Sequence, residues 1–343
     1  ALLVVVALAR TAEAGVGRII FVRGGTLLAQ PADSTSAPTT LTALPEGIRV
    51  SGLEATRDGK LIVADLGNAS AWLVGGKWHK TDCIGRARTS KTGECLACPT
   101  REGYVVVSTT SGVSRTMPPP LREVGFLGDS IVDVIGLTDQ GVIAVEIERP
   151  GGRHLLANHG ARSHLLAAPD GVRAVAVFGE GNASRINVFA LDGKGIPRRL
   201  GGPGVPIGWS WDAQWVLIQE GILPREETPE DEEPEGDEGA LNAAAAPATF
   251  LFGAPPRRWR PKSKKKAPPP EPPAPRTQAC AVRAVGGETK CWRGFDALGF
   301  SPDSTHVLLR KDNVLYSGRI AGVRPAPPRP LVENVDGAAV WVP

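Results

Sequence analysis

The stretch Arg57-Asp58-Gly59-Lys60-Leu61-Ile62-Val63-Ala64 places a polar turn directly before a run of strand-forming residues. Asp and Gly favour tight turns, and branched aliphatic residues favour strands. Similar stretches begin at Arg101, Asp139 and Pro169, and more degenerate copies begin at Trp211 and Ser301. We interpret each copy as the turn that joins the innermost strand of a repeated unit to its second strand.

The spacing of these turns indicates the size of the unit. The third turn residues stand at positions 59, 103, 141, 171, 213 and 304, which gives intervals of 44, 38, 30, 42 and 91 residues. A four-stranded propeller blade occupies roughly 40–45 residues. The longest interval contains a segment of disordered composition from about Arg225 to Gln278, and removing its 54 residues leaves 91 − 54 = 37. Each interval therefore predicts one blade.

The two ends of the chain carry complementary halves of a further unit. Residues 337–343 form an inner strand with no second strand after it, whereas residues 18–22 form a second strand with no inner strand before it. The hairpin Gly24-Gly25 then leads into residues 26–29. We predict an all-β propeller of seven four-stranded blades, closed by N- and C-terminal strands in one blade. Six blades is the alternative if one weak copy is not a blade.

Two of the turns resemble a known repeat signature. Phe300-Ser301-Pro302-Asp303-Ser304 and Trp209-Ser210-Trp211-Asp212 resemble the S-P-D-G signature of TolB-like, WD-related propeller repeats. Arg198-Arg199-Leu200 is similar to the outer-strand ending in that family. The likeness covers most of residues 18–343, and the copies at Arg101-Glu102, Asp139-Gln140 and Asp212-Ala213 depart from it. It implies a periplasmic propeller with a role in envelope protein complexes, and it carries over no catalytic residue.

The first residues form an apolar run, residues 1–9, that is too short to span a bilayer. Ala12-Glu13-Ala14 follows it at the distance of a signal-peptide cleavage site. We predict a signal-peptide remnant over residues 1–14, a propeller domain over residues 15–343, and export to the periplasm or the extracellular space. A buried N-terminal strand is the alternative interpretation.

Five cysteines accompany this prediction of export. Cys280 and Cys291 flank a Gly-Gly hairpin, so a disulfide across it is geometrically reasonable. Cys83 has two candidate partners, Cys95 and Cys98, and we assign Cys98. The rival interpretation is zinc at the C-x-x-C of Cys95 and Cys98, but a structural zinc site needs four ligands, and no second pair has matching spacing.

The predicted insertion, at about residues 225–278, changes the sign of its charge along its length. Nine acidic residues fall within residues 226–238, and a Pro-rich tract covers residues 268–275. Such composition favours disorder. A cationic group lies between these tracts and is our candidate partner-binding segment: Arg257, Arg258, Trp259, Arg260, Lys262, Lys264, Lys265 and Lys266. It could contact anionic membrane surfaces or acidic polymers. An inert solvated loop, or pairing between the acidic and basic halves, are the alternatives.

Candidate catalytic groups are few. Gly208-Trp209-Ser210-Trp211-Asp212 lacks the second Gly of a nucleophile elbow. His154, His159 and His164 fit a hairpin with its turn near residues 158–161, which would make His154 and His164 cross-strand neighbours. Asn68-Ala69-Ser70 and Asn182-Ala183-Ser184 match glycosylation sequons, but we interpret them as turns between second and third strands. We expect no catalytic residue, no metal and no cofactor.

Four tryptophans lie on or near predicted inner strands: Trp209, Trp211, Trp215 and Trp341. We expect most of them to pack between blades, and some to line the channel mouth, where they could bind a peptide or a sugar. The net charge of +3 is too small to indicate nucleic-acid binding. The predicted function is a non-catalytic scaffold, monomeric on its own, that binds a protein or an envelope polymer. The alternative is a propeller hydrolase or lyase with a metal in its central channel.

Overall fold

The computed structural model describes residues 17–33, 36–44, 48–56, 58–66, 69–80, 83–117, 121–128, 134–138, 141–145, 153–157, 161–179, 181–192, 196–222, 276–322 and 326–343. The chain divides into two units, residues 1–222 with 276–343, and residues 223–275. The predicted signal-peptide remnant and the cationic residues 257–266 lie outside the described residues. Among the described residues, no helix has the length and apolar character to cross a bilayer.

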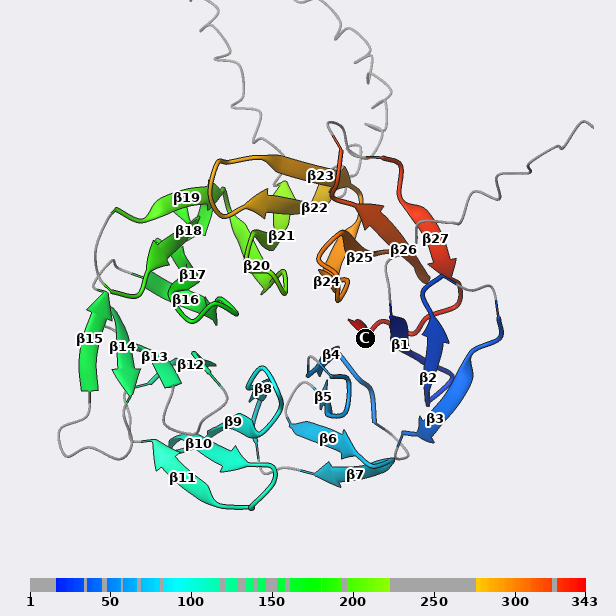
Figure 1. The fold of residues 1–343 in the computed structure, drawn as a ribbon, viewed down its shortest axis with the longest axis horizontal. Coiled ribbons are helices and arrows are strands. Elements are labelled where there is room, and N and C mark those ends of the chain that lie inside the picture. Colours follow the sequence, from blue (N-terminus) through cyan, green and yellow to red (C-terminus); the bar gives the residue numbers. More distant parts are fainter. Residues whose placement is uncertain are drawn as a thin grey trace, which may run out of the picture. The chain divides into compact units, whose positions relative to one another are not determined.

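The first unit consists of seven four-stranded antiparallel sheets, which we call blades 1 to 7 (Figure 1). Blade 1 contains β4 (Gly52–Ala55), β5 (Ile62–Asp65), β6 (Ser70–Val74) and β7 (Lys77–Lys80). Blade 2 contains β8 (Arg88–Thr89), β9 (Cys95–Thr100), β10 (Gly103–Ser108) and β11 (Ser114–Met117). Blade 3 contains β12 (Glu123–Phe126), β13 (Val134–Thr138), β14 (Gly141–Val145) and β15 (Arg153–Ala157).

Blade 4 contains β16 (Ala161–Ala167), β17 (Arg173–Phe178), β18 (Arg185–Ala190) and β19 (Arg198–Gly201). Blade 5 contains β20 (Gly204–Trp209), β21 (Trp215–Ile222), β22 (Arg276–Arg283) and β23 (Thr289–Arg293). Blade 6 contains β24 (Asp296–Phe300), β25 (His306–Lys311), β26 (Val314–Arg319) and β27 (Arg329–Val332), and blade 7 contains β28 (Ala339–Val342), β1 (Arg18–Arg23), β2 (Thr26–Pro31) and β3 (Thr39–Ala43). A short 3-10 helix, η1 (Gly181–Ala183), lies between β17 and β18.

The predicted seven-bladed propeller is confirmed, including its shared closing blade. In blade 7 the C-terminal strand β28 is innermost and pairs with β1 in the register Ile19 to Trp341 and Ile20 to Val340. Strand β1 continues through the Gly24-Gly25 turn into β2. The backbone hydrogen bonds of this sheet therefore join the two ends of the chain and close the ring.

The turn between the first and second strands owes its conformation to a buried hydroxyl. In blade 6, Ser301 Oγ accepts the backbone N–H of His306 at 2.9 Å and donates to Asp303 at 2.5 Å. The third turn residue, Ser304, has a φ of 59°, a left-handed conformation that favours Gly. Thr56, Ser90 and Ser210 accept the equivalent N–H groups in blades 1, 2 and 5. The repeated polar turn is thus a hydrogen-bonded unit.

Two of the six predicted copies occupy a different turn. The stretches that begin at Arg101 and Asp139 lie between second and third strands, β9–β10 and β13–β14, rather than between first and second strands. Both satisfy the local pattern, because any tight hairpin of a blade favours Gly and acidic residues. The first turn of blade 2 is instead Ser90-Lys91-Thr92-Gly93, in which Gly93 N–H bonds Ser90 O at 3.1 Å. This turn has Thr92 where the corresponding turns of blades 1, 4, 5 and 6 have Asp.

The core consists of layers between neighbouring blades. Val175 and Ile186 of blade 4 pack in one cluster with Val216 and Ile218 of blade 5, and all four are fully buried. Leu308 of blade 6 shares another cluster with Trp341 of blade 7. An isolated blade would expose these faces, so each blade depends on its neighbours for burial.

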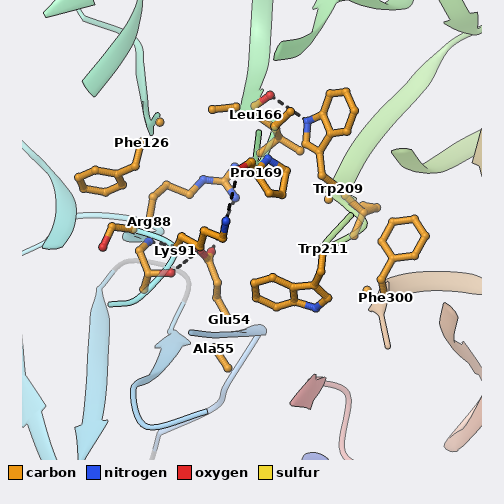
Figure 2. Close-up of a pocket in the computed structure, with 18 of the residues that line it drawn as sticks. Glu54, Ala55, Arg88, Lys91, Phe126, Leu166, Pro169, Trp209, Trp211 and Phe300 are labelled. Atoms are coloured by element: carbon orange, nitrogen blue, oxygen red, sulfur yellow. Dashed lines mark hydrogen bonds and ion pairs between the residues drawn. The ribbon is translucent and has the colours of Figure 1, made fainter. Parts of the chain in front are cut away.

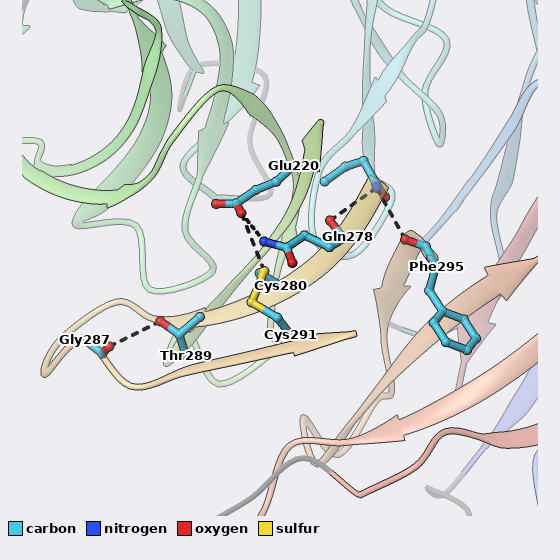
Figure 3. The surroundings of a disulfide bond; sticks show 8 residues. Glu220, Gln278, Cys280, Gly287, Thr289, Cys291 and Phe295 are labelled. Carbon is cyan, nitrogen blue, oxygen red and sulfur yellow. Dashed lines mark hydrogen bonds between the residues drawn. A yellow bond between two sulfur atoms is a disulfide. The ribbon is translucent and has the colours of Figure 1, made fainter. Parts of the chain in front are cut away.

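Both predicted disulfides are present. Cys280 and Cys291 are direct cross-strand partners in β22 and β23 and are bonded to each other (Figure 3). Cys83 is bonded to Cys98 of β9. Cys95, also on β9, is a buried thiol in the cluster between blades 2 and 3, whereas Cys98 lies in the cluster between blades 1 and 2. Residues three apart on a strand face opposite sides, so the C-x-x-C does not converge on a metal.

The predicted histidine hairpin is wrong, because β15 belongs to blade 3 and β16 to blade 4, so His154 and His164 are not cross-strand partners. The insertion is shorter at its end than predicted, because residues 276–278 pair with β21 as part of β22. Residues 182–184 do lie between the second and third strands β17 and β18, whereas Asn68 is outside the described residues and Ser70 is the first residue of β6.

Candidate functional site

A cavity of about 250 Å³ opens where the seven inner strands end (Figure 2). Its lining comes from the carboxyl ends of β4, β8, β12, β16, β20 and β24, together with β28. The turns after β8, β16 and β20 contribute Lys91, Pro169 and Trp211. We call this cavity the upper mouth. Because every blade places the same end of its inner strand here, the fold itself gathers side chains from distant parts of the sequence.

One wall of the upper mouth is cationic. Arg88 lies on the short strand β8, Arg86 precedes it and Lys91 follows it. Glu54 of β4 faces the two arginines. Glu54 Oε2 lies 3.6 Å from Arg86 Nη2 and 3.8 Å from Arg88 Nη1. Lys91 Nζ donates to Pro169 O at 3.4 Å. Two arginines therefore share one carboxylate, and Lys91 bonds a neutral carbonyl.

Burial affects the Arg88 guanidinium. Loss of hydration lowers the pKa of Arg88, and the neighbouring charge of Arg86 lowers it further, while Glu54 opposes both effects. An arginine starts from so high a pKa that it stays protonated at neutral pH. The lowered pKa indicates that the buried positive charge is unfavourable. An anion in the cavity would relieve that cost.

The other wall is aromatic. Figure 2 shows Trp209, Trp211 and Phe300 across the cavity from Arg88 and Lys91. Trp209 is fixed in place, because its Nε1 donates to Leu166 O at 3.1 Å and the Arg173 guanidinium lies 5.6 Å from its ring centroid. Such rings offer an apolar surface to a ligand without losing much side-chain freedom.

The rim of the upper mouth is held by bonds between blades. Arg173 of blade 4 donates to Ala213 O of blade 5 at 2.8 Å. The backbone N–H of Asp212 in blade 5 in turn donates to Ser304 Oγ of blade 6 at 3.2 Å. Adjacent turns therefore support one another, which favours a preformed site.

Deeper carboxylates tie the inner strands together. Glu54 Oε1 accepts the backbone N–H and the hydroxyl of Thr89 in the next blade, at 3.2 and 3.0 Å. Glu123 of blade 3 has the same role toward blade 4, where it accepts the N–H groups of His164 and Leu165 at 2.6 and 2.7 Å. Burial raises the pKa of the Tyr104 hydroxyl, and the charge of Glu123 raises it further. These carboxylates act as structural bridges.

The opposite mouth differs in character. A larger cavity, about 960 Å³, is lined by residues near the amino ends of β24, β28 and β4, among them Asp296, Arg310, Asp312 and Asp336. Arg310 pairs with Asp296 at 2.8 Å, and Asp336 accepts the N–H of Gly24 at 2.5 Å. Asp296, Arg310 and Asp336 are thus engaged within the protein.

Within the part of the chain that the structure describes, no three His, Cys, Asp or Glu side chains gather as metal ligands. The described lining of the upper mouth contains Ser90, whose hydroxyl accepts the Cys95 N–H at 3.0 Å and so holds a turn. The described lining thus presents charged groups and aromatic rings to a ligand.

The structure brings together only part of the predicted site. Trp209, Trp211 and Trp341 line the upper mouth, as expected for some of the tryptophans, whereas Trp215 lies on β21 and is not part of the lining. The cationic residues 257–266 lie outside the described residues. Sequence reasoning missed Glu54, Arg86, Arg88 and Lys91. The turn from Ser90 to Gly93 is a copy of the repeated turn without Asp. Its recognition would have directed attention to Arg86, Arg88 and Lys91, which lie in or just before it.

Comparisons with known proteins identify the fold and no family. No protein-family model matches the sequence, and no curated protein matches it. A chain of a mitotic checkpoint complex is 12% identical with a TM-score of 0.53, covering 85% of this chain and 82% of that one. Hydrazine synthase from Kuenenia stuttgartiensis is 8% identical with a TM-score of 0.50, covering 81% and 80%.

TolB from Acinetobacter baumannii is also similar, at 13% identity and a TM-score of 0.48. The match covers 94% of this chain but 66% of TolB, so this chain spans slightly less than two thirds of that protein. The seven blades are consistent with the TolB-like propeller that the repeat turns indicated. At these identities the likeness concerns the fold alone.

Proposed function

We propose that the chain is a non-catalytic binding module that holds a segment of a partner protein in its upper mouth. The observation that carries this proposal is the composition of the cavity, which joins a cationic wall to an aromatic wall. Sites that bind ligands are typically apolar, with a few fixed polar groups that set orientation. A ring of inner strands gives such a site a rigid base.

An exported location is part of the proposal. Two disulfides in one domain support an oxidising compartment, because cytosolic thiols are kept reduced. The partner would then be a protein of the cell envelope or its surroundings. The cationic residues 257–266 of the insertion remain a second candidate contact, for an anionic polymer or membrane surface.

Site-specific crosslinking tests the proposal. A photoreactive amino acid replaces Trp211 in the mouth and, as a matched control, Thr40 on the exposed outer strand β3. We expect one discrete crosslinked protein from the Trp211 position, its yield reduced at least fivefold by the additional change Arg88→Gln. Equal crosslinking from both positions, or none from Trp211, would contradict a partner site in the mouth.

The alternative of a hydrolase or lyase with a channel metal makes a different prediction. A catalytic metal would copurify with the protein in about equimolar amount. Elemental analysis of the protein, purified without chelator, distinguishes the two. Stoichiometric zinc, iron or calcium would favour the enzyme.

A further inference from the structure

The cationic wall of the upper mouth has more positive charge than the protein neutralises. Glu54 Oε2 faces both Arg86 and Arg88, yet it lies 3.6 and 3.8 Å away, beyond hydrogen-bond length. Its other oxygen, Oε1, accepts two hydrogen bonds from Thr89. Lys91 donates to a neutral carbonyl, which leaves its charge uncompensated. Counting these four groups, the wall carries three positive charges and one negative charge.

The two guanidiniums also have donors to spare. Within the described residues, neither Arg86 nor Arg88 donates a hydrogen bond to a protein acceptor, although Arg88 is only 23% exposed at its side chain. Each guanidinium carries five N–H donors in a planar fork that matches a carboxylate. An incoming carboxylate can therefore accept from one or both forks without displacing any hydrogen bond that the protein makes.

The apolar wall opposite the arginines favours a carboxylate attached to an apolar group over a free inorganic phosphate, which would leave that wall in contact with water. Across the cavity, Trp211 and Phe300 offer an apolar surface. The ligand that fits both walls has one carboxylate beside an aromatic or aliphatic group.

We propose that the upper mouth selects an acidic side chain, Asp or Glu, flanked by apolar residues in an extended peptide segment. The carboxylate lies between Arg86 and Arg88 with Lys91 beside it, and the flanking apolar side chain packs against Trp211 and Phe300. This inference rests on the proposed function and names the chemical class of the segment that the mouth holds. Specificity for the carboxylate follows because an amide would leave the guanidinium charges uncompensated.

Two capped peptides test the proposal: acetyl-Gly-Phe-Asp-Phe-Gly-amide and the same peptide with Asn in place of Asp. Binding is measured by isothermal titration with the full-length, disulfide-bonded protein at low salt. We expect the Asp peptide to bind at least fivefold more tightly than the Asn peptide. The difference should shrink at 0.5 M salt, because exposed parts of the charge interaction are screened.

Variants locate the effect. Arg88→Gln and Arg86→Gln should each reduce the affinity for the Asp peptide at least threefold and change the affinity for the Asn peptide less than twofold. Arg88→Lys keeps the charge without the planar fork and should give an intermediate loss. Arg101→Gln, an exposed arginine in the β9–β10 turn of the same blade, is the matched control and should change neither affinity. Thermal unfolding of every variant checks that it folds.

Each other outcome counts against the inference. Equal affinity for the two peptides would overturn carboxylate selection, as would failure of both to bind. Displacement of the Asp peptide by inorganic phosphate at lower concentration than by acetate would make the mouth a phosphate site instead. In all three cases the crosslinking from Trp211 still decides independently whether a partner occupies the mouth.

Discussion

Single hydroxyl groups determine the geometry of this propeller's inner turns. Ser301, like Thr56, Ser90 and Ser210, is at most 1% exposed and accepts a backbone N–H that would otherwise lack a partner. A buried N–H left unsatisfied costs about 1–3 kcal/mol. The residue two positions later completes the turn, since Asp303 receives the serine hydroxyl and the Thr305 N–H. This is why Ser or Thr and Asp recur at fixed spacing.

The charge of Asp303 makes this turn sensitive to acid. Burial raises the pKa of Asp303, but hydrogen bonds from Ser301 and Thr305 outweigh it, so the net pKa lies below its usual 3.8. A carboxyl whose pKa is lowered by folding stabilises the fold above its unfolded pKa, and that stability is lost as the pH falls through the folded pKa. Asp303→Asn should therefore lower the unfolding free energy at pH 6 and have a smaller effect below pH 3.8.

Urea denaturation of both proteins at several pH values measures this difference. Asp312→Asn, an exposed residue in the next turn of the same blade, is the control and should show no such trend. A difference between wild type and Asp303→Asn that stays constant with pH would rule out the charge as the cause.

At the scale of the strand and the blade, the same turn chemistry occurs at two structurally distinct positions. Hairpins between first and second strands and hairpins between second and third strands both use Gly and acidic residues. The copies at Arg101 and Asp139 belong to the second kind. The number of blades was still correct, because blades 1 to 6 each contributed one copy of either kind, and the strands near the two ends of the sequence indicated blade 7. Local turn signals therefore count blades more reliably than they assign strands within them.

Each disulfide adds a covalent link within one blade. Cys280–Cys291 joins β22 to the outermost strand of blade 5, and Cys83–Cys98 joins the entry of blade 2 to β9. Replacing both members of the Cys83–Cys98 pair by Ala should lower the unfolding free energy by about 3 kcal/mol, the usual effect for a closed loop of about 15 residues. Urea midpoints with and without reductant measure the loss.

Cys95→Ala serves as the control for that experiment. Because Cys95 is not in a disulfide, the variant should keep the same response to reductant as the wild type. If the Cys95 variant loses the response, the native pairing involves Cys95 and the assignment of Cys98 is wrong.

On the scale of the whole molecule, closure of the ring depends on blade 7. Strand β28 supplies its inner strand and contributes Trp341, which is 2% exposed and packs against blade 6. Without β28 the inner edge of β1 and the adjoining faces of two blades would be exposed. Closure is thus the step that makes the seven units one cooperative body.

Removal of residues 339–343 should lower the unfolding free energy by more than about 4 kcal/mol, because truncating one buried Trp alone costs about 3–5 kcal/mol.

In contrast, replacing residues 223–275 with Asn-Gly should cause no loss of unfolding free energy. Ile222 and Arg276 are already cross-strand partners, so a two-residue turn can join them. Each halving of the loop length also lowers the entropic cost of closing the loop by about 0.6 kcal/mol.

Calorimetry of the two proteins tests both expectations. A ring that unfolds as cooperatively without residues 339–343 as with them would show that blade 7 is dispensable. A large loss on replacing residues 223–275 would instead show that this segment contributes to the folded unit.

The sequence by itself determined the blade number, the shared closing blade and both disulfide positions, because these depend on turn residues and strand patterns that are local. It also placed several tryptophans near inner strands. Only the tertiary structure decided which side chains form the upper mouth. Glu54, Arg88, Trp211 and Phe300 are separated by up to 246 residues, and they meet because the ring brings the same end of each inner strand to one axis. No local pattern records that convergence, so the candidate site followed from the fold.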